Sequence, residues 1–315
     1  MNLNMRKGLV GCGIFLLLAV LLWALHPGNT PEATEPTLPT PEFSLAATHA
    51  FVYDSGRDIL LFTKGDAQAQ LPMASLTKLF TCYVALQYLE PETVVTAGNE
   101  VELIHPESST AYIRPGHKLT VDMLVQGVLL PSGNDAAYVL AAAAGRAAEN
   151  DPNMDYKAAA EAFVAKMNAQ ALAVGMKNTH FANPDGMDEK NHYTCLADLV
   201  IMGKVALQNA TIARHAATAQ ADVTYASGQT NTWINSNLLL QKNSGYYEEK
   251  ATGLKTGTTN GAGNCLLSSF QTEDGYLLIG VLGCPEDADR YQDTLRLYTY
   301  STTGRAMTVP GDEPA

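Results

Sequence analysis

The chain has 315 residues, of which 46% are apolar and 17% charged, enough to bury a sizeable core in one large domain or two smaller ones. Its formal net charge of −12 argues against a nucleic-acid partner, because a protein that binds phosphate backbones needs clustered lysine and arginine. Its five scattered cysteines lack a C-x-x-C pair, and its seven histidines lack H-x-H or H-E-x-x-H spacing. We therefore expect no dense disulfide framework, no metal site and no cofactor.

The first predicted element is an apolar segment near the N-terminus. Arg6 and Lys7 precede an uninterrupted apolar run at 8–25, whose 18 residues just reach the length needed to cross a bilayer. The run does not end in the A-x-A-like site at which secretory signal peptides are cleaved. We expect residues 1–26 to be a membrane anchor, and a cleaved signal sequence is the alternative.

A change of composition follows the apolar segment. Residues 27–43 contain five prolines together with threonine and glutamate, which is typical of an extended linker. At about 3.1 Å per residue, such a linker spans roughly 50 Å. We expect the domain at 44–303 to be held outside the membrane, and residues 304–315 to be a short tail.

Strand patterns lie near both ends of the domain, and helical patterns lie between them. Predicted strands occupy 51–53, 59–62, 253–258, 265–270 and 276–282. Predicted helices occupy 72–89, 121–130, 135–148, 163–174, 196–207 and 288–300. This order predicts an α+β fold in which strands from both ends bracket central helices.

Two cysteines lie on neighbouring predicted strands. Asp274 and Gly275 indicate a two-residue hairpin turn, and counting outward from it places Cys265 opposite Cys284. A cross-strand disulfide is one interpretation. The other, which we favour, is that two small apolar side chains pack on the same face of the sheet.

Ser75 and Lys78 stand three residues apart in the first predicted helix, so they share one helix face. A serine hydroxyl is a poor nucleophile at neutral pH, and a lysine accepts its proton only if burial or a neighbouring positive charge lowers the lysine pKa. Apolar side chains around Lys78 predict that it is buried. Because S-x-x-K spacing arises by chance about once in a chain of this size, the pair alone does not identify a function.

Two triplets complete a recognisable constellation. Ser132, Gly133 and Asn134 follow an apolar helix, and Lys255, Thr256 and Gly257 lie on a predicted strand. With Ser75 and Lys78, they correspond in order to the S-x-x-K, S-D-N and K-T-G signature of class A β-lactamases and penicillin-binding proteins, with Gly133 in place of the aspartate.

Within this superfamily the chain resembles the serine-type D-alanyl-D-alanine carboxypeptidases, the low-molecular-mass penicillin-binding proteins. The resemblance covers about 47–300. It is carried by ASLTK at 74–78, SGNDAA at 132–137, NTHFANPDGM at 178–187, GLKTGTT at 253–259 and AGNCL at 262–266. It implies a β-lactamase/transpeptidase-like fold, in which helices flank an antiparallel sheet and the active site lies between the sheet and a helical subdomain.

The resemblance also implies a mechanism and partners. Ser75 attacks the carbonyl of a D-Ala-D-Ala stem peptide of peptidoglycan, releases the terminal D-alanine and forms an acyl-enzyme that water hydrolyses. β-Lactam antibiotics such as penicillin inhibit the enzyme covalently. Lys78 is the base, with its pKa lowered by burial and by Lys255, and Ser132 relays the proton to the leaving amine.

The remaining predicted site residues bind the substrate. Asn134 holds an amide of the peptide, and Lys255, Thr256 and Thr258 bind the terminal carboxylate. Gly257 permits a close approach of the backbone. Backbone N–H groups of Ser75 and Thr258 form the oxyanion hole.

One departure from the family pattern lies at Ser236. Many members have an arginine between the two asparagines that here are Asn235 and Asn237. A serine cannot pair with a carboxylate as a guanidinium does, so we expect carboxylate affinity to depend more on Lys255 and the threonines.

Three alternatives to the hydrolytic carboxypeptidase are considered. A class A-like β-lactamase needs a glutamate to activate the deacylating water, and no glutamate followed three residues later by asparagine lies between the second and third motifs. A non-catalytic cell-wall-binding protein would not need Ser75 and Lys78 together. Transpeptidation differs from hydrolysis only in the acceptor of the acyl group, and the sequence leaves it open.

Overall fold

The structure of the protein, a computed structural model, describes residues 43–304. The predicted membrane anchor at 1–26 lies outside the described residues. So do all but the last residue of the predicted linker at 27–43 and all but the first residue of the tail at 304–315.

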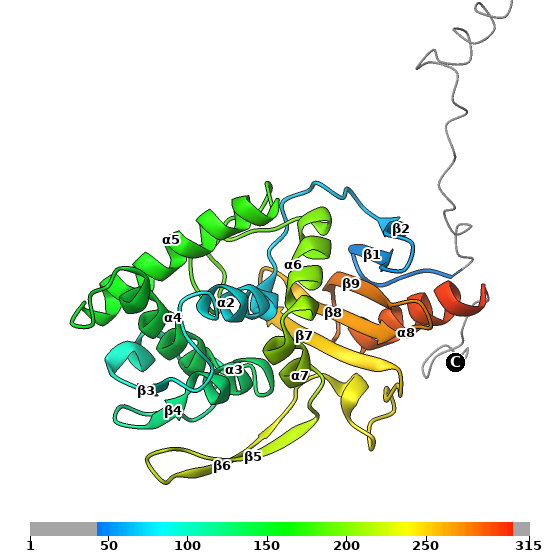
Figure 1. Ribbon diagram of the computed structural model, residues 1–315. Coiled ribbons are helices and arrows are strands. Elements are labelled where there is room, and N and C mark those ends of the chain that lie inside the picture. The colour runs from blue at the N-terminus through cyan, green and yellow to red at the C-terminus, as the bar shows by residue number, and fades with distance from the viewer. Residues whose placement is uncertain (1–42, 305–315) are drawn as a thin grey trace, which may run out of the picture. The chain divides into compact units, whose positions relative to one another are not determined.

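The centre of the described chain is a five-stranded antiparallel sheet (Figure 1). In spatial order its strands are β2 (Ile59–Lys64), β1 (His49–Asp54), β9 (Tyr276–Cys284), β8 (Gly263–Gln271) and β7 (Ala251–Thr259). The predicted strands from both ends of the domain meet where β1 pairs with β9, with His49 opposite Leu282. Every pairing in the sheet is antiparallel, which confirms the predicted α+β fold.

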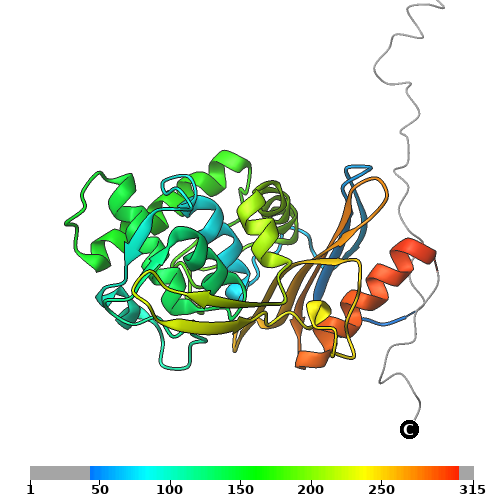
Figure 2. The same cartoon turned by 60° about the horizontal axis from the view of Figure 1, so that its bottom comes forward.

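Helices cover both faces of this sheet (Figures 1 and 2). One side carries the 3₁₀ helices η1 (Ala74–Leu76) and η2 (Asn99–Leu103) and the helices α2 (Thr77–Ala85), α3 (Val121–Leu129), α4 (Asn134–Ala148), α5 (Tyr156–Val174), α6 (Leu196–Gln208) and α7 (Ala210–Ala216). The other side carries α8 (Asp287–Thr303). The remaining elements are η3 (Leu238–Leu240) and two two-stranded sheets, β3 (Val94–Thr96) with β4 (Lys118–Thr120) and β5 (Gln220–Thr224) with β6 (Thr230–Ile234).

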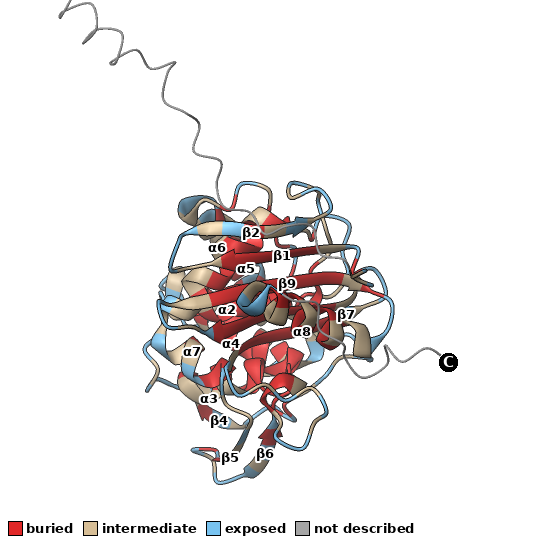
Figure 3. Cartoon of the chain, turned by 90° about the vertical axis from the view of Figure 1, so that its right-hand side faces the viewer, coloured by how far each residue is buried: buried red, intermediate tan, exposed pale blue. Residues whose placement is uncertain are grey.

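Two hydrophobic cores follow from this layering. The larger lies between the sheet and the helical part and includes Phe80 of α2 and Leu140 of α4. The smaller lies between the sheet and α8 and includes Ile279 and Tyr291. The sheet is therefore buried on both faces along β8 and β9. Figure 3 shows β9 largely in the colour of buried residues.

Helix α5 begins earlier than predicted. The sequence pattern indicates a start at Phe163, whereas the helix starts at Tyr156. The carboxylate of Asp155 accepts hydrogen bonds from the backbone N–H groups of Lys157 and Ala158 and caps the helix. The predicted end is confirmed, because Gly175 follows the helix in a left-handed conformation, with φ +97°.

The predicted register around Cys265 and Cys284 is wrong. Gln271 pairs with Tyr276, so the turn holds four residues instead of two. A bulge between Asn264 and Leu266 then places Cys284 opposite Asn264. Cys265 belongs to the core on the helical side and Cys284 to the core beneath α8, and both thiols are free. The two side chains thus face opposite sides of the sheet.

Within residues 43–304, no single helix is long and apolar enough to cross a membrane. Helices α6 and α7 pass that test only as a pair, and they are bent by 99° relative to each other.

Candidate active site

The helical wall of the candidate site begins with Ser75 and Lys78. Ser75 lies in η1, and Lys78 lies on the first turn of α2, which continues from it. The Lys78 Nζ atom is 2.7 Å from the Ser75 Oγ atom and donates a second hydrogen bond, of 2.6 Å, to the backbone carbonyl of Asp185. The nucleophile and base predicted from the spacing are therefore in direct contact.

Lys78 is fully buried, with no exposed surface. Burial lowers the pKa of Lys78 to about 8, although the nearby carboxylates of Asp185 and Asp135 act in the opposite direction. A lysine with this pKa is partly neutral near physiological pH, which is the state that accepts a proton. A contribution from Lys255 is predicted from the sequence, whereas the lowering of the Lys78 pKa comes from burial.

A chain of polar contacts supports the turn that presents Ser75. The backbone N–H of Ala182 donates to Nδ1 of His192, so Nε2 of this ring carries the proton and donates to the Thr77 hydroxyl at 2.7 Å. Thr77 in turn donates to the carbonyl of Ala74 at 2.8 Å. Burial lowers the pKa of His192 to about 4, which keeps the ring neutral.

Gly186 packs directly against the same turn. A Cβ atom at Gly186 would lie 2.0 Å from the Ala74 carbonyl oxygen, and the glycine has φ +90°. A side chain is therefore excluded for two reasons, contact and backbone conformation. The Asn183–Gly186 turn both approaches the Ser75 turn and supplies the carbonyl that binds Lys78.

The second triplet lies between α3 and α4. Ser132 is nearly buried and has φ +61°, and Asn134 is the first residue of α4. Ser109 donates to the carbonyl of Ser132 at 2.7 Å, and the Asn134 amide donates to the Ser108 hydroxyl at 2.7 Å. Within residues 43–304 the Ser132 hydroxyl makes no hydrogen bond, so the relay of a proton through it remains a prediction.

The opposite wall is β7, the strand at the edge of the sheet. It carries all of the third predicted group, with Lys255, Thr256 and Gly257 buried and Thr258 exposed. A Cβ atom at Gly257 would lie 3.0 Å from the backbone nitrogen of Ser75. The absence of a side chain at Gly257 thus allows β7 to approach the nucleophile closely.

Lys255 is as buried as Lys78 but has cationic neighbours. Its Nζ atom donates to the carbonyl of Thr256 at 3.1 Å. Burial lowers the pKa of Lys255 well below its ordinary value, and the charges of Lys78 and Arg290 lower it further. The neighbours that lower the pKa of Lys255 are therefore cations, whereas the carboxylates near Lys78 raise the pKa of that lysine.

Two contacts on β7 were not predicted. The hydroxyls of Ser236 and Thr256 share a hydrogen bond of 2.6 Å, so the serine found in place of the family arginine borders the predicted carboxylate site. Arg290 reaches β7 from α8 and donates to the Gly257 carbonyl at 3.1 Å and to the Thr258 hydroxyl at 2.9 Å. The guanidinium also forms an ion pair with the carboxylate of Asp287. A guanidinium is therefore present, but it comes from a different element.

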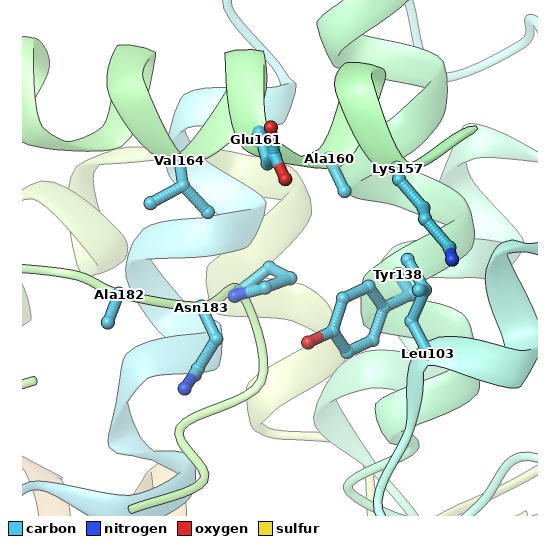
Figure 4. Close-up of a pocket in the computed structure, with 9 residues that line it drawn as sticks. Leu103, Tyr138, Lys157, Ala160, Glu161, Val164, Ala182 and Asn183 are labelled. Atoms are coloured by element: carbon cyan, nitrogen blue, oxygen red, sulfur yellow. The ribbon is translucent and has the colours of Figure 1, made fainter. Parts of the chain in front are cut away.

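Behind the helical wall lies a separate pocket of about 330 Å³ (Figure 4). Its lining includes Tyr138 of α4, Lys157 and Glu161 of α5, and Asn183 with Pro184 from the turn that precedes Asp185. None of the eight predicted site residues lines it. Within residues 43–304, no three histidine, cysteine, aspartate or glutamate side chains gather where they could hold a metal ion.

Known proteins are similar to this chain in sequence. A family profile described as D-alanyl-D-alanine carboxypeptidase matches residues 33–285. The D-alanyl-D-alanine carboxypeptidase DacC of Escherichia coli strain K12 is 30% identical over 307 residues, which cover 94% of this chain and 69% of that protein. The D-alanyl-D-alanine carboxypeptidase of Streptomyces sp. strain K15 is 32% identical over 290 residues, 89% of this chain and 94% of the relative.

A solved structure shares the fold as well. The crystal structure of the Streptomyces K15 DD-transpeptidase superposes with a TM-score of 0.73 at 28% identity. The superposition covers 82% of this chain and 98% of that one.

Proposed function

Because the chain belongs to the D-alanyl-D-alanine carboxypeptidase family, we propose that it removes the terminal D-alanine from peptidoglycan stem peptides through an acyl-enzyme on Ser75. The observation that carries the assignment of roles is the contact between Ser75 Oγ and the buried amine of Lys78 at 2.7 Å. A hydroxyl next to a lysine whose pKa is about 8 has a base that accepts its proton at neutral to mildly alkaline pH.

The Asp185 carbonyl orients the base. A carbonyl oxygen only accepts hydrogen bonds, so Lys78 must direct an N–H toward Asp185. In neutral Lys78 this leaves the nitrogen lone pair free to accept the proton of Ser75, its other neighbour. Burial thus sets the protonation state of the base, and the Asn183–Gly186 turn sets its direction.

Acylation then proceeds with a balanced transfer of protons. Ser75 Oγ bonds to the carbonyl carbon of the penultimate D-alanine as its proton moves to Lys78, and the backbone N–H groups of Ser75 and Thr258 stabilise the oxyanion. The C–N bond to the terminal D-alanine breaks, and Ser132 passes the proton from Lys78 to the leaving amine. Water then attacks the acyl-enzyme as neutral Lys78 takes one of its protons, the ester bond to Ser75 breaks, and Lys78 returns that proton to the Ser75 oxygen.

The β7 wall is suited to an anion. Lys255 and Arg290 place positive charge behind Thr256 and Thr258, so the terminal carboxylate of the substrate binds to Lys255 and to the two hydroxyls. As the strand at the edge of the sheet, β7 offers backbone groups to an extended peptide. Asn134 holds an amide on the acyl side, and the same groups receive a β-lactam.

The location follows from the segment before the domain. We propose that residues 1–26 anchor the protein in the cell membrane, that residues 27–43 form a tether, and that the catalytic domain at 44–303 acts outside the cytoplasm. Residues 304–315 then form a short tail.

The test is release of D-alanine from diacetyl-Lys-D-Ala-D-Ala, followed by mass spectrometry. The wild type is expected to release D-alanine and Ser75→Ala is expected to release none. Ser301→Ala, in α8, is the matched control and should behave like the wild type. Release by Ser75→Ala, or by none of the three proteins, would contradict the proposal.

The same assay separates the alternatives. Adding glycine as an acceptor reports transfer, a second outcome suggested by the DD-transpeptidase from Streptomyces, because a transpeptidase forms diacetyl-Lys-D-Ala-Gly whereas hydrolysis forms diacetyl-Lys-D-Ala. Sustained hydrolysis of nitrocefin would instead favour a β-lactamase, whereas we expect a single slow burst.

A further inference from the structure

Tyr112 combines two properties that rarely occur together. Its side chain is 70% exposed, the highest value for an aromatic residue within 43–304. Its backbone has φ +61°, in the left-handed region that favours glycine. An exposed aromatic ring removes little apolar surface from water, so it stabilises the fold little. The left-handed backbone conformation costs on the order of 1–2 kcal/mol of free energy. Neither property contributes to stability.

The other residues with positive φ indicate that Tyr112 is part of the candidate site. Five non-glycine residues among 43–304 have positive φ. Two of them, Asp58 and Asn150, are of the types that tolerate it. The others are Ala74, which precedes Ser75, Ser132 of the second triplet, and Tyr112. Strained backbone tends to gather at functional sites, and two of these three positions already lie in the candidate site.

The surrounding structure holds Tyr112 firmly in this conformation. Asp135, on the first turn of α4, accepts hydrogen bonds of 2.8 Å from the backbone N–H groups of both Ala111 and Ile113, the two neighbours of Tyr112. The carbonyl of Ala111 accepts hydrogen bonds from Trp233 at 3.1 Å and Asn231 at 3.0 Å. The segment is fixed from both sides, and its one exposed ring is presented on a rigid support.

That support adjoins the second triplet. A Cβ atom at Gly133 would lie 2.8 Å from the Cβ and the backbone nitrogen of Ala111, so the segment packs directly on the triplet. Ser109, three residues before Tyr112, bonds to Ser132 and accepts from the backbone N–H of Asn134. Tyr112 therefore stands beside the second triplet of the helical wall, close to Asn134, with its ring exposed.

We propose that Tyr112 is a specificity-determining residue whose ring packs against apolar or aromatic groups on the acyl side of the ligand. This proposal rests on the proposed function. The groups it contacts are the stem-peptide residue that precedes the penultimate D-alanine and, in a penicillin, the acylamino side chain. A rigid ring selects by contact area at little cost in conformational entropy. The hydroxyl plays no part in this role.

The test compares two penicillins that share the reactive ring. Benzylpenicillin has an aromatic side chain, and 6-aminopenicillanic acid has none. We expect Tyr112→Ala to lower the second-order rate of acylation by benzylpenicillin by about threefold to tenfold, the range for one aromatic contact, and to leave acylation by 6-aminopenicillanic acid unchanged. Tyr112→Phe should retain the wild-type ratio of the two rates.

Two further variants keep the test decisive. Tyr112→Gly adopts the positive φ without strain, so it replaces the alanine variant if that protein misfolds. Tyr88→Ala removes the next most exposed tyrosine, which is 40% exposed and lies beyond the end of α2, and should match the wild type. Equal loss of rate with both penicillins, or no loss with either, would overturn the role of Tyr112. Failure of the wild type to be acylated by benzylpenicillin would instead refute the proposed function.

Discussion

Lys78 and Lys255 face the candidate site from opposite walls, and their electrostatic surroundings differ in sign. Both are buried, and burial is the main reason that both pKa values are lowered. Lys78 has the carboxylates of Asp185 and Asp135 near it and ends with a pKa of about 8. Lys255 has the cations Lys78 and Arg290 near it, and its pKa is lowered further.

The difference shows how one residue type serves two purposes. Lys78 exchanges its proton near neutral pH and has a fixed donor direction, which suits a base. Lys255 lies in an environment short of negative charge, so an entering carboxylate supplies the missing partner and raises its pKa. The helical wall is thus built for proton transfer and the sheet wall for binding an anion.

The largest expected effect is on the helical wall. Lys78→Ala removes the base, and the rate of acylation by a fluorescent penicillin should fall by about 10³-fold, within the range for a general base. Gel-based labelling over time measures this rate. Lys177→Ala, an exposed lysine, is the control and should label normally. A loss of less than about tenfold in Lys78→Ala would assign the base to another group.

The second test is the pH dependence of acylation. Lys78 accepts a proton only when neutral, and with a pKa of about 8 it becomes protonated as the pH falls below 8. The second-order rate should therefore fall about fiftyfold between pH 8 and pH 6, with a slope that approaches tenfold per pH unit well below the pKa. Asp185→Asn removes a carboxylate that raises this pKa, so its profile should shift to lower pH. An acylation rate that stays constant from pH 6 to pH 8 would contradict the role of Lys78 as the base that titrates in this range.

The sheet wall should respond differently. Lys255→Ala should raise KM for diacetyl-Lys-D-Ala-D-Ala by about tenfold to a hundredfold, the range for a charge-assisted hydrogen bond. With a peptide that ends in D-alaninamide the variant should lose little further activity, because no carboxylate is present. Steady-state kinetics with both peptides check this. If both peptides lost activity equally, Lys255 would belong to the proton-transfer machinery.

The smallest effect concerns the support of the Ser75 turn. Burial lowers the pKa of His192 from its ordinary 6.5 to about 4, so below pH 6.5 the unfolded chain binds a proton that the folded protein does not. The free energy of unfolding should therefore decrease as the pH falls from 6.5 to 4, by up to about 3 kcal/mol. Urea unfolding at several pH values measures this. His192→Gln cannot titrate, so an unchanged pH dependence in that variant would show that other groups cause it.

Local patterns predicted much of this site. The three-residue spacing of Ser75 and Lys78 fixes their shared helix face, and the apolar side chains around Lys78 indicate its burial. Both follow from periodicity within one segment, and the structure places Nζ 2.7 Å from Oγ. The five strands of the sheet were also predicted, because their alternating or continuous apolar runs are bounded by turn residues.

Local sequence patterns did not predict the contacts between distant segments of the chain. Arg290 reaches β7 from α8, and an arginine three residues after Asp287 predicts only a surface ion pair. The group from Asp185 that binds Lys78 is its backbone carbonyl. Every residue has such a carbonyl, so the residue type does not reveal this contact. The predicted register of Cys265 is wrong because the bulge beside it and the four-residue turn shift the strand pairing, and neither gives a strong local signal in the sequence.

The most direct test of the account is the site of covalent modification by benzylpenicillin. The protein is treated, digested and mapped by tandem mass spectrometry, with Ser75→Ala processed in parallel. We predict one adduct per wild-type chain, carried by the Ser75 hydroxyl, and none on Ser75→Ala. An adduct on Ser132 or another side chain, or the same modification of both proteins, would contradict the assignment of Ser75 as the nucleophile beside Lys78.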